Sequence, residues 1–345
     1  MKKLKVLVLM RKDVVPPETV KGMTSKEKEA APWKCEYDVR TGLEALGHEV
    51  QPLGLSDDLG VLRRAVEEWN PDIAFNLLEE FHNVATYEQH VVAYLELLRR
   101  AYTGCNPSGL MLARDKALSK KILTYHRIQV PDFGVFPLNR RVKRPKRLKL
   151  PLIVKSVTEE GSAGISQASL VDTDEKLVER VEFVHKNIGS DAIAEEFIEG
   201  RELYVGIMGN QRLEALPIWE IFLDAMPQDA VRIATAKVKW DPDYQKRHGI
   251  KTGPAGELPP GAEDRILRIC KRVYRLLNLS GYARLDLRFT PDGRVYVLEA
   301  NPNPNLDKED DFAQSAKKGG IEYDQLLQRL VAFGQSYVPP WKVWA

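Results

Sequence analysis

A hairpin with one polar face is the sequence feature that most restricts what this chain can fold into. The segment ARLDLRFTPDGRVYVLEANPNPNL runs from Ala283 to Leu306. Two alternating stretches flank Pro291, Asp292 and Gly293, which are turn residues, so the segment predicts a β-hairpin. A half-buried hairpin needs apolar side chains on one face. Here carboxylates, an amide and guanidinium groups recur on the other face, inside the strands.

The expected register separates the two faces. We expect a four-residue loop over 290–293, which sets Phe289 opposite Arg294 and Arg284 opposite Glu299. Because side chains alternate along a strand, one face is then apolar and packs on a core. Its members are Ala283, Leu285, Leu287, Phe289, Tyr296, Leu298 and Ala300. The other face carries Arg284, Asp286, Arg288, Val295, Val297, Glu299 and Asn301.

Three oxygen-bearing side chains, Asp286, Glu299 and Asn301, point into one space in this register. Carboxylate and amide oxygens are hard ligands of the kind that Mg²⁺ prefers. Arg284 beside them suits a phosphate oxygen or a developing oxyanion. The alternative is a solvated sheet face with a cross-strand Arg284–Glu299 ion pair.

Composition limits the class of protein. A chain of 345 residues is expected to form two or three domains, and 43% apolar with 29% charged residues indicate a soluble globular protein. A net charge of +2 gives no reason to expect binding to nucleic acid. No stretch approaches a membrane span, and the apolar start MKKLKVLVLM indicates a first strand rather than a signal peptide. Three widely spaced cysteines fit reduced thiols, so we expect a cytoplasmic protein.

Strands alternate with helices in the first part of the chain. The expected strands cover 5–10, 48–53 and 71–77, and the expected helices cover 36–47 and 59–69. This alternation predicts a parallel, doubly wound α/β domain, whose ligands bind at the carboxyl ends of the strands.

The remainder of the chain indicates a mixed α+β architecture. A basic helix at 113–131 precedes a charged connector at 140–150, for which nucleic-acid binding is the less favoured alternative because no aromatic residues interleave the charges. The segment 151–171 predicts a strand, a Gly/Ser loop and a strand, and 191–211 predicts two more strands. Further helices are expected at 174–188, 263–281 and 323–334.

Two features of the middle segment are compatible with phosphate binding. The GSAG loop at 161–164 could cradle a phosphate with its backbone N–H groups, although most such loops are only hairpin turns. It is neither a Walker loop nor a Rossmann fingerprint. Lys155 ends an apolar strand, where a lysine is costly unless it is paired or bound to phosphate.

The order of five segments resembles the ATP-grasp superfamily, and within it the D-alanine–D-alanine ligase group. The segments are DKxLxK, IVK before a Gly/Ser loop, EEFIEGREL, PAxEL and ARLDLR…YVLEANPNP, and the resemblance covers about residues 100–305. It implies an ATP-grasp architecture with an N-terminal α/β domain. The implied limits are 1–115 for that domain, 116–200 for a central subdomain with the Gly/Ser loop, and 201–345 for a C-terminal subdomain with the metal site.

The resemblance also implies the activity. Such enzymes phosphorylate a carboxylate with ATP and let an amine attack the acyl phosphate, so the implied partners are a small-molecule carboxylate and amine. The implied cofactors are ATP and two Mg²⁺ ions, with Mn²⁺ as a substitute. Because an acyl phosphate hydrolyses readily, we expect a lid, for which the breaker-rich segment 240–254 is the candidate. A homodimer is left open.

The resemblance assigns the nucleotide site residue by residue. Lys116 and Lys155 match lysines that contact the ATP phosphates, and Ser162 lies in the matching phosphate-covering loop. The linker whose backbone contacts adenine matches Glu196, Phe197 and Ile198. The acid that binds ribose matches Glu202.

The reaction centre is assigned in the same way. Lys237 matches a lid lysine near the γ-phosphate, and Arg284 matches the arginine beside the reacting phosphate. The ligands of the two magnesium ions match Asp286, Glu299 and Asn301. The polar face of the hairpin would then be the platform for metal and phosphoryl transfer.

Both substrate pockets depart from the family pattern. The glycine-rich segment that holds the first amino acid has no clear counterpart, and the tyrosine expected after the lid lysine is Val238. After Asn301 the family has small residues and a serine, whereas this chain has a run with four acids. They are Asp307, Glu309, Asp310 and Asp311. We therefore expect a ligase of different specificity, with a basic or extended amine as acceptor.

Three further acids and a histidine are candidates for the altered pocket. Glu79, Glu80, His82 and Glu88 could line it, and the alternative is that they begin a charged helix. Two other functions are kept open, which are phosphate transfer to a small molecule without amide formation and ATP binding without catalysis. The complete metal set argues against the last.

Overall fold

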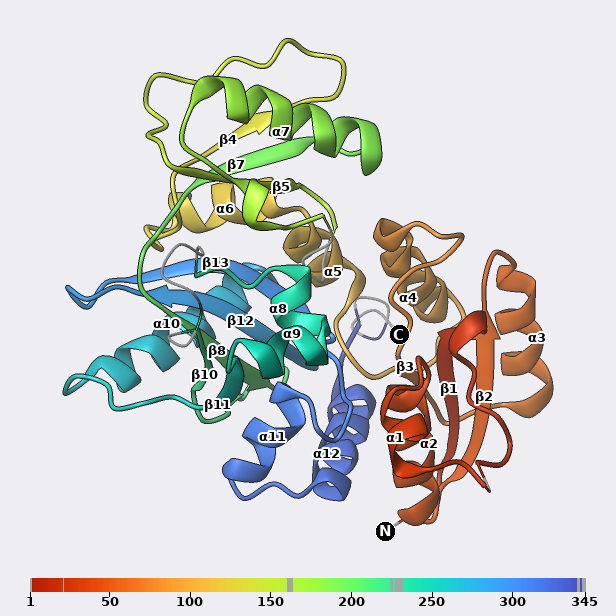
Figure 1. Ribbon diagram of the computed structural model, residues 1–345. Helices are drawn as coiled ribbons and strands as arrows, with labels where there is room; N and C mark the ends of the chain where they lie inside the picture. Colours follow the sequence, from red (N-terminus) through yellow and green to blue (C-terminus); the bar gives the residue numbers. More distant parts are fainter. Residues whose placement is uncertain are drawn as a thin grey trace.

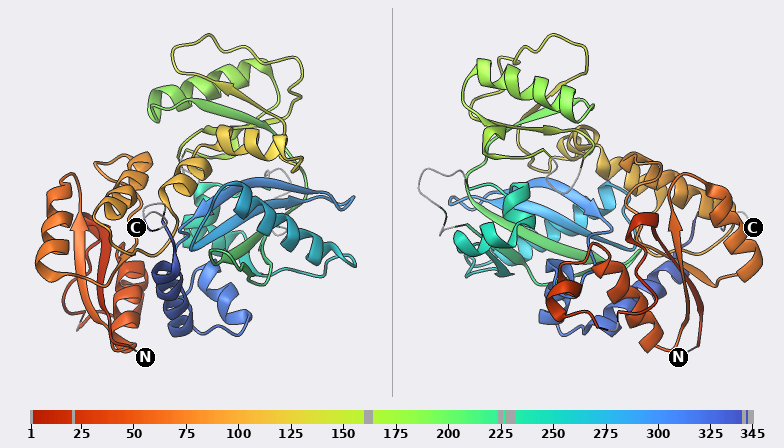
Figure 2. Two further views of the ribbon diagram at one scale, coloured as in Figure 1. Left: turned by 180° about the vertical axis from the view of Figure 1, so that it is seen from behind. Right: turned by 45° about the vertical axis from the view of Figure 1, so that its right-hand side comes forward.

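Three β-sheets, one in each part of the chain, organise the fold in the computed structural model (Figure 1). The structure describes residues 2–20, 22–159, 164–223, 226, 232–339 and 342. We name the N-terminal, central and C-terminal lobes after the three sheets. The central lobe lies above the C-terminal sheet, and the N-terminal lobe lies beside it; Figure 2 shows the same arrangement from behind.

The N-terminal lobe has the parallel α/β layer that the alternating pattern predicts. Its strands pair in the order β2-β1-β3, all parallel, and the interior of β1 is wholly buried. The strands are β1 (Lys5–Arg11), β2 (Glu49–Leu55) and β3 (Ile73–Asn76). The helices are α1 (Ser25–Glu29), α2 (Lys34–Ala45), α3 (Leu59–Trp69) and α4 (Glu88–Leu97).

Two short helices, α5 (Pro107–Arg114) and α6 (Lys116–Tyr125), connect this lobe to the others. Asp115 ends α5 and caps α6, because its Oδ1 accepts hydrogen bonds from the backbone N–H groups of residues 117 and 118 at 2.9 and 2.8 Å. The cap fixes Lys116 in the first turn of α6, where its side chain is 5% exposed.

The central lobe is a four-stranded antiparallel sheet in the order β4-β7-β5-β6, and it has a core of its own. Its elements are β4 (Phe133–Phe136), β5 (Leu152–Ser156), β6 (Leu170–Val171), α7 (Asp174–Asn187) and β7 (Ala192–Glu196). Leu152, Val154 and Ala194 from the sheet pack on Leu177 and Val181 of α7. The connector 140–150 contains neither helix nor strand, as expected.

The C-terminal lobe is built on a six-stranded sheet, β11-β10-β8-β12-β13 with β9 beside β8. Its strands are β8 (Arg201–Met208), β9 (Glu214–Ala215), β10 (Trp219–Phe222), β11 (Lys251–Pro254), β12 (Tyr282–Phe289) and β13 (Val295–Pro302). Its helices are α8 (Ala236–Trp240), α9 (Pro242–Arg247), α10 (Ala262–Leu276), α11 (Asp311–Lys318) and α12 (Tyr323–Ser336).

Two details of this lobe differ from expectation. The helix expected over 263–281 ends at Leu276, and Gly281 instead takes φ +69° where its backbone passes Gly104. A Cβ at Gly281 would lie 2.4 Å from the Gly104 carbonyl oxygen, so only glycine fits. The two strands expected within 191–211 are present as β7 and β8, but they belong to different sheets, so 197–200 crosses between lobes.

The register expected for the β12–β13 hairpin is wrong, although its polar face forms. Phe289 lies opposite Val295, so the loop has five residues, and Thr290 N–H donates to the Arg294 carbonyl across it at 3.0 Å. A register shift next to Asp286 then leaves Leu298 without an opposite residue.

This bulge restores the alternation. Asp286 lies opposite Glu299, and Arg284 lies opposite Asn301, so the four polar residues share one face. Between the loop and the bulge, the side chains of β13 point to the sheet faces opposite to those expected. Val295 and Val297, which we expected on the polar face, are 4% and 1% exposed in the core, whereas Tyr296 and Leu298 are only partly buried.

The N-terminal and C-terminal lobes share a hydrophobic core. Val39 and Leu43 of α2 and Ile73 of β3 belong to the same buried cluster as Leu327 and Leu330 of α12. Figure 1 shows α12 between the two lobes. The central lobe does not contribute to this cluster, which makes it the separable part of the described structure. Within the described residues, no helix has both the length and the apolar composition to cross a membrane.

We predict that Leu327→Ala lowers the free energy of unfolding by about 2–5 kcal/mol, because the fully buried side chain fills the shared core. Leu97→Ala is the matched control, since Leu97 is 79% exposed and its loss should change stability by less than about 0.5 kcal/mol. Urea denaturation measures both. Equal small effects would mean that the two lobes do not depend on this contact.

Candidate active site

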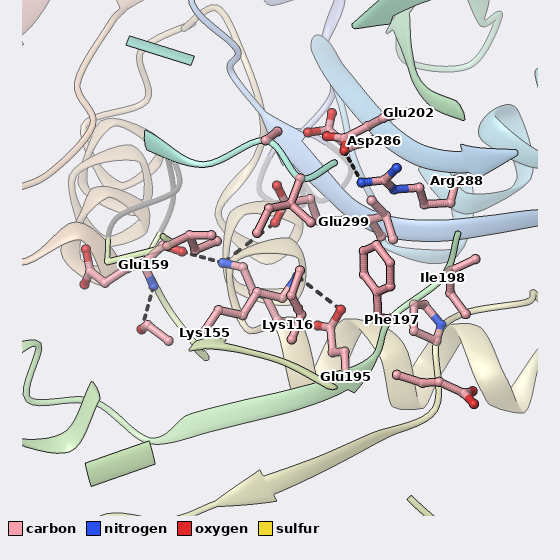
Figure 3. Close-up of a pocket in the computed structure, with 18 of the residues that line it drawn as sticks. Lys116, Lys155, Glu159, Glu195, Phe197, Ile198, Glu202, Asp286, Arg288 and Glu299 are labelled. Carbon is pink, nitrogen blue, oxygen red and sulfur yellow. Dashed lines mark hydrogen bonds and ion pairs between the residues drawn. The ribbon is translucent and has the colours of Figure 1, made fainter. Parts of the chain in front are cut away.

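A pocket between the central and C-terminal lobes collects most of the residues singled out from the sequence (Figure 3). We call it the interlobe pocket. Its lining includes Lys116, Lys155, Glu196, Phe197, Ile198, Glu202, Asp286 and Glu299. Arg284 and Asn301 line an adjoining cleft, and Glu159 lines both cavities. The polar face of the hairpin therefore runs from one cavity into the other.

Lys237, the lid lysine expected from the sequence, lines neither the interlobe pocket nor the adjoining cleft. It is exposed on α8, whereas Lys239, two residues further on, lines the interlobe pocket. We therefore replace Lys237 with Lys239 in the candidate site, and the residue after the lid lysine becomes Trp240 instead of Val238. Ser162 lies outside the described residues.

A buried carboxylate, Glu195, lines the interlobe pocket and pairs with two lysines, of which Figure 3 shows Lys155. Its Oε1 lies 3.4 Å from Lys120 Nζ and its Oε2 lies 3.1 Å from Lys155 Nζ. Lys120 Nζ also donates to the Leu298 carbonyl on β13, so it links the central and C-terminal lobes. Burial lowers the pKa of Lys120 to about 8. Burial acts in the same direction on Lys155, but Glu195 and Glu299 outweigh it and raise the pKa of that lysine.

Glu299 is held ionised by nearby cations. Burial by itself would raise the pKa of this carboxyl, but four cations hold it well below its usual range. They are Lys116, Lys155, Lys239 and Arg284. Lys116 Nζ lies 3.9 Å from Glu299 Oε2 and also donates to the Glu159 carbonyl.

Arg284 and Asp286 form a bidentate pair on β12. Arg284 Nε donates to Asp286 Oδ1 at 2.8 Å, and Arg284 Nη2 donates to Oδ2 at 3.0 Å. The guanidinium lies 4.8 Å from the ring centroid of Tyr204. Burial raises the pKa of Asp286, although Arg284 and Lys239 act against it. Arg284 is thus oriented by a carboxylate and an aromatic ring at the junction of the two cavities.

The donor set on the hairpin fits a hard divalent cation. Asp286 and Glu299 lie directly opposite each other, which brings their Cβ atoms to about 4.5–5.5 Å. The amide nitrogen of Asn301 is buried and has no hydrogen-bond partner within the described structure, and rotation of the amide would present its oxygen at the same place. No three His, Cys, Asp or Glu side chains among the described residues are grouped to hold a metal, so such a site depends on the Asn301 oxygen.

The far end of the interlobe pocket is organised by Arg288. Its Nη2 lies 2.7 Å from Glu202 Oε2, and its Nη1 donates to the Gly200 carbonyl at 2.7 Å. Tyr204 Oη donates to the other oxygen of Glu202 at 3.0 Å. The Arg288 guanidinium lies 5.9 Å from the Phe197 ring, which Figure 3 shows over the pocket. These contacts fix both ends of the crossing segment 197–200.

The adjoining cleft has a volume of about 580 Å³ and lies where β1 and β3 end. Its lining includes Arg11, Glu36, Glu79, Glu80, Glu88, Arg114, Arg284, Asn301 and Asp310. Glu88 is buried in an ion pair with Arg114 at 2.6 Å and accepts from Asn303 Nδ2 at 3.0 Å. His82, a sequence candidate, is exposed and does not line the cleft.

Of the four acids after Asn301, only Asp310 lines the cleft. Asp307 forms an ion pair with Lys34, and Asp311 accepts a hydrogen bond from Trp219 Nε1 at 3.0 Å. Glu309 is exposed. The acidic run therefore adds one carboxylate to the cleft instead of four.

Several site residues were not predicted from the sequence. Two of them could have been found from spacing. Lys120 lies one helical turn after Lys116, and Glu195 lies on the same face of its strand as Ile193, because side chains alternate along a strand. Arg288 was assigned to the polar face but to no role. Nothing local to the sequence around Glu36 indicated that it reaches the cleft.

Comparison with known proteins covers nearly the whole chain. A family model described as "D-ala D-ala ligase C-terminus" matches residues 123–332. "Uncharacterized protein y4sG" of Sinorhizobium fredii is 28% identical over 314 residues, which cover 87% of this chain and 88% of the relative. A protein of Desulforudis audaxviator named D-alanine–D-alanine ligase is 29% identical over 311 residues, which cover 87% and 94%.

The fold is also that of a solved structure. The crystal structure of D-alanine–D-alanine ligase from Bacillus anthracis complexed with ATP superposes with a TM-score of 0.72 at 23% identity. The superposition covers 96% of this chain and 97% of the other. The likeness therefore includes the N-terminal lobe as well as the part matched by the family model.

We predict that Glu195→Gln destabilises the protein by about 3–5 kcal/mol, because it leaves two buried lysines without the carboxylate between them. The matched control is Glu214→Gln, which breaks the exposed 2.6 Å pair with Arg329 and should cost less than about 1 kcal/mol. Chemical denaturation at pH 7 compares the two. A Glu195 variant as stable as the control would mean that the cluster is solvated.

Proposed function

The chain belongs to the D-alanine–D-alanine ligase family and has the ATP-grasp fold of that family, and from this premise we propose that it joins a carboxylate and an amine other than two molecules of D-alanine. As a member of the family it is an ATP-dependent ligase that forms a C–N bond between small molecules and yields ADP. The observation that carries the proposal is the polar face of β12–β13, because it spans both cavities.

The interlobe pocket is the proposed nucleotide site. Lys116 and Lys155 extend ammonium groups into it and suit the phosphates of ATP. The crossing segment at 196–198 would contact adenine through its backbone, and Glu202 would bind ribose. Lys239 takes the role first assigned to Lys237, since its Nζ lies 3.9 Å from Asp286 Oδ2 at the phosphoryl end of the pocket.

Magnesium would be held by Asp286, Glu299 and Asn301. The set is hard and oxygen-based, and the cations around Glu299 keep that carboxylate ionised and ready to bind. Bound magnesium would neutralise negative charge on the triphosphate and on the departing phosphate. Two ions, with Mn²⁺ as a substitute, are part of the proposal. Arg284 would have to share Asp286 with the metal, and that exchange frees its guanidinium for the substrate.

The chemistry follows from the position of Arg284 between the cavities. A carboxylate oxygen of the first substrate attacks the γ-phosphorus of ATP, ADP leaves, and an acyl phosphate forms. The amine then attacks the acyl carbon, phosphate departs with the electrons of the C–O bond, and the amine loses a proton. Arg284 stabilises negative charge on the transferred group and on the tetrahedral carbon. The segment 240–254 would exclude water while the acyl phosphate exists.

The adjoining cleft is the proposed substrate site, and its chemistry differs from that expected for two D-alanines. Asp310 lines the cleft from the segment in which the family has a carboxylate-binding serine, and an acid there repels a substrate carboxylate. Glu79, Glu80 and Glu36 add further acids from the N-terminal lobe. A basic or extended amine is therefore the proposed acceptor. A homodimer and a cytoplasmic location remain predictions.

We predict that Asp286→Asn lowers the rate of ADP release at least about 100-fold and raises the Mg²⁺ concentration needed for half-maximal rate, because a charged ligand is lost. Asp292→Asn is the matched control, since Asp292 lies in the exposed loop of the same hairpin. The rates are measured over a Mg²⁺ series and again with Mn²⁺. Equal Mg²⁺ dependence in both variants would contradict the metal site.

An ADP-release screen tests the proposed function. With ATP and Mg²⁺ we expect turnover for particular pairs of carboxylates with basic amino acids or polyamines, and mass spectrometry should find the amide. D-Alanine alone should give at most about one hundredth of the best rate, because its second carboxylate meets Asp310. Brisk formation of D-alanyl-D-alanine would return the protein to the activity of its relatives. A phosphorylated product without an amide would indicate phosphate transfer instead.

A further inference from the structure

One carboxylate oxygen in the adjoining cleft, Oε2 of Glu36, has no hydrogen-bond partner within the described structure. Glu36 lies in the first turn of α2, lines the cleft, and is only 9% exposed. Its Oε2 is itself buried. A buried carboxylate oxygen without a donor costs free energy in the unliganded protein, unless a ligand supplies the donor.

The cleft's own cations are committed elsewhere. Arg11 is held by Asp13, with its Nε 3.0 Å from Asp13 Oδ1, and it lies 3.7 Å from Glu80. Arg114 is paired with Glu88 and Arg284 with Asp286. Each guanidinium that lines the cleft thus faces a carboxylate other than Glu36.

The charged groups near Glu36 do not donate a hydrogen bond to its Oε2. They are Glu79 after β3, Arg11 at the end of β1 and Asp13 beyond it. Burial is the largest cause and raises the pKa of Glu36 to about 7, against the hydrogen bond from its own backbone; Glu79 adds to the rise, and Arg11 opposes it less strongly. The carboxyl is therefore poised between its two forms near neutral pH, and a bound cation would fix it as the carboxylate.

We propose that the adjoining cleft holds a cationic group of a substrate against Glu36, so that one of the two substrates carries a basic group in addition to its α-ammonium group and the groups that react. This rests on the proposed function, which makes the cleft the substrate site. An ammonium or guanidinium supplies both the donor that Oε2 lacks and the charge that balances Glu36 and Glu79. An anionic group is disfavoured there by the same two acids.

The test compares compounds that differ only in the basic group. Binding to the full-length protein, with a non-hydrolysable ATP analogue and Mg²⁺, is measured by calorimetry for lysine against norleucine, in both enantiomers, and for 1,5-diaminopentane against pentylamine. We expect the dibasic member of at least one pair to bind roughly tenfold or more tightly, as for one charge-assisted hydrogen bond. Glu36→Gln should reduce the difference to about twofold without changing affinity for the ATP analogue.

Glu44→Gln is the matched control, because Glu44 lies on the same helix and is 51% exposed. It should leave the preference unchanged. Titrations near pH 7 in two buffers of different ionisation enthalpy should detect proton release in the wild type and none in Glu36→Gln. The release follows because the bound cation lowers the pKa of a carboxyl that is about half protonated before binding.

Failure of this inference can be told apart from failure of the proposed function. If no dibasic compound binds better than its partner, or if Glu36→Gln keeps the preference, the cation subsite is wrong even where ADP-releasing pairs are found. If the preference depends on Glu36 but no carboxylate–amine pair releases ADP, the subsite stands and the proposed specificity fails.

Discussion

The bulge at Leu298 is the local feature on which the rest of the site depends. With a five-residue loop and no bulge, Asp286 would face Leu298, and Glu299 and Asn301 would turn into the core. One extra residue returns both to the face of Arg284. The carbonyl of Leu298, at the bulge, accepts a hydrogen bond from Lys120 of α6. The same irregularity therefore aligns the candidate metal ligands and ties the helix between the lobes to the hairpin.

The buried charges of the interlobe pocket balance one another across the lobes. Glu195 of the central sheet pairs with Lys120 and Lys155, and the cations around Glu299 also face Glu195 and Asp286. Acids as well as cations line the pocket, so a triphosphate would need Mg²⁺ to neutralise the carboxylates beside it. Because the central lobe keeps its own core, it can move against the shared core of the other two lobes without breaking either.

Much of the fold could be predicted from the sequence because its signals are local. Strand and helix alternation gave the N-terminal layer, and alternation of polar and apolar residues gave the polar face of the hairpin. The register could not be predicted, since loop length and a bulge are set by packing of Val295 and Val297 in the core. The expected loop was one residue too short, and the bulge was not expected. The two errors cancelled for the sheet face of Glu299 and Asn301, but they left Val295 and Val297 on the wrong face.

Contacts between distant segments were also beyond sequence reasoning. The periodicity of a five-residue helix cannot say whether Lys237 or Lys239 faces a pocket made by other lobes; in the structure Lys239 lines the pocket and Lys237 does not. The segment at 197–200 looks like a hairpin tip in sequence, yet it crosses between sheets. Glu36 lies 265 positions before Asn301 and meets the same cleft only in the folded chain.

A structure of the protein with a non-hydrolysable ATP analogue and magnesium tests the central claim most directly. We expect oxygens of Asp286, Glu299 and Asn301 at about 2.0–2.1 Å from magnesium, with the phosphates against Lys116 and Lys155. Arg284 should then have turned from Asp286 toward the γ-phosphate. A nucleotide bound elsewhere, or a metal that leaves both Asp286 and Glu299 uncoordinated, would contradict the account.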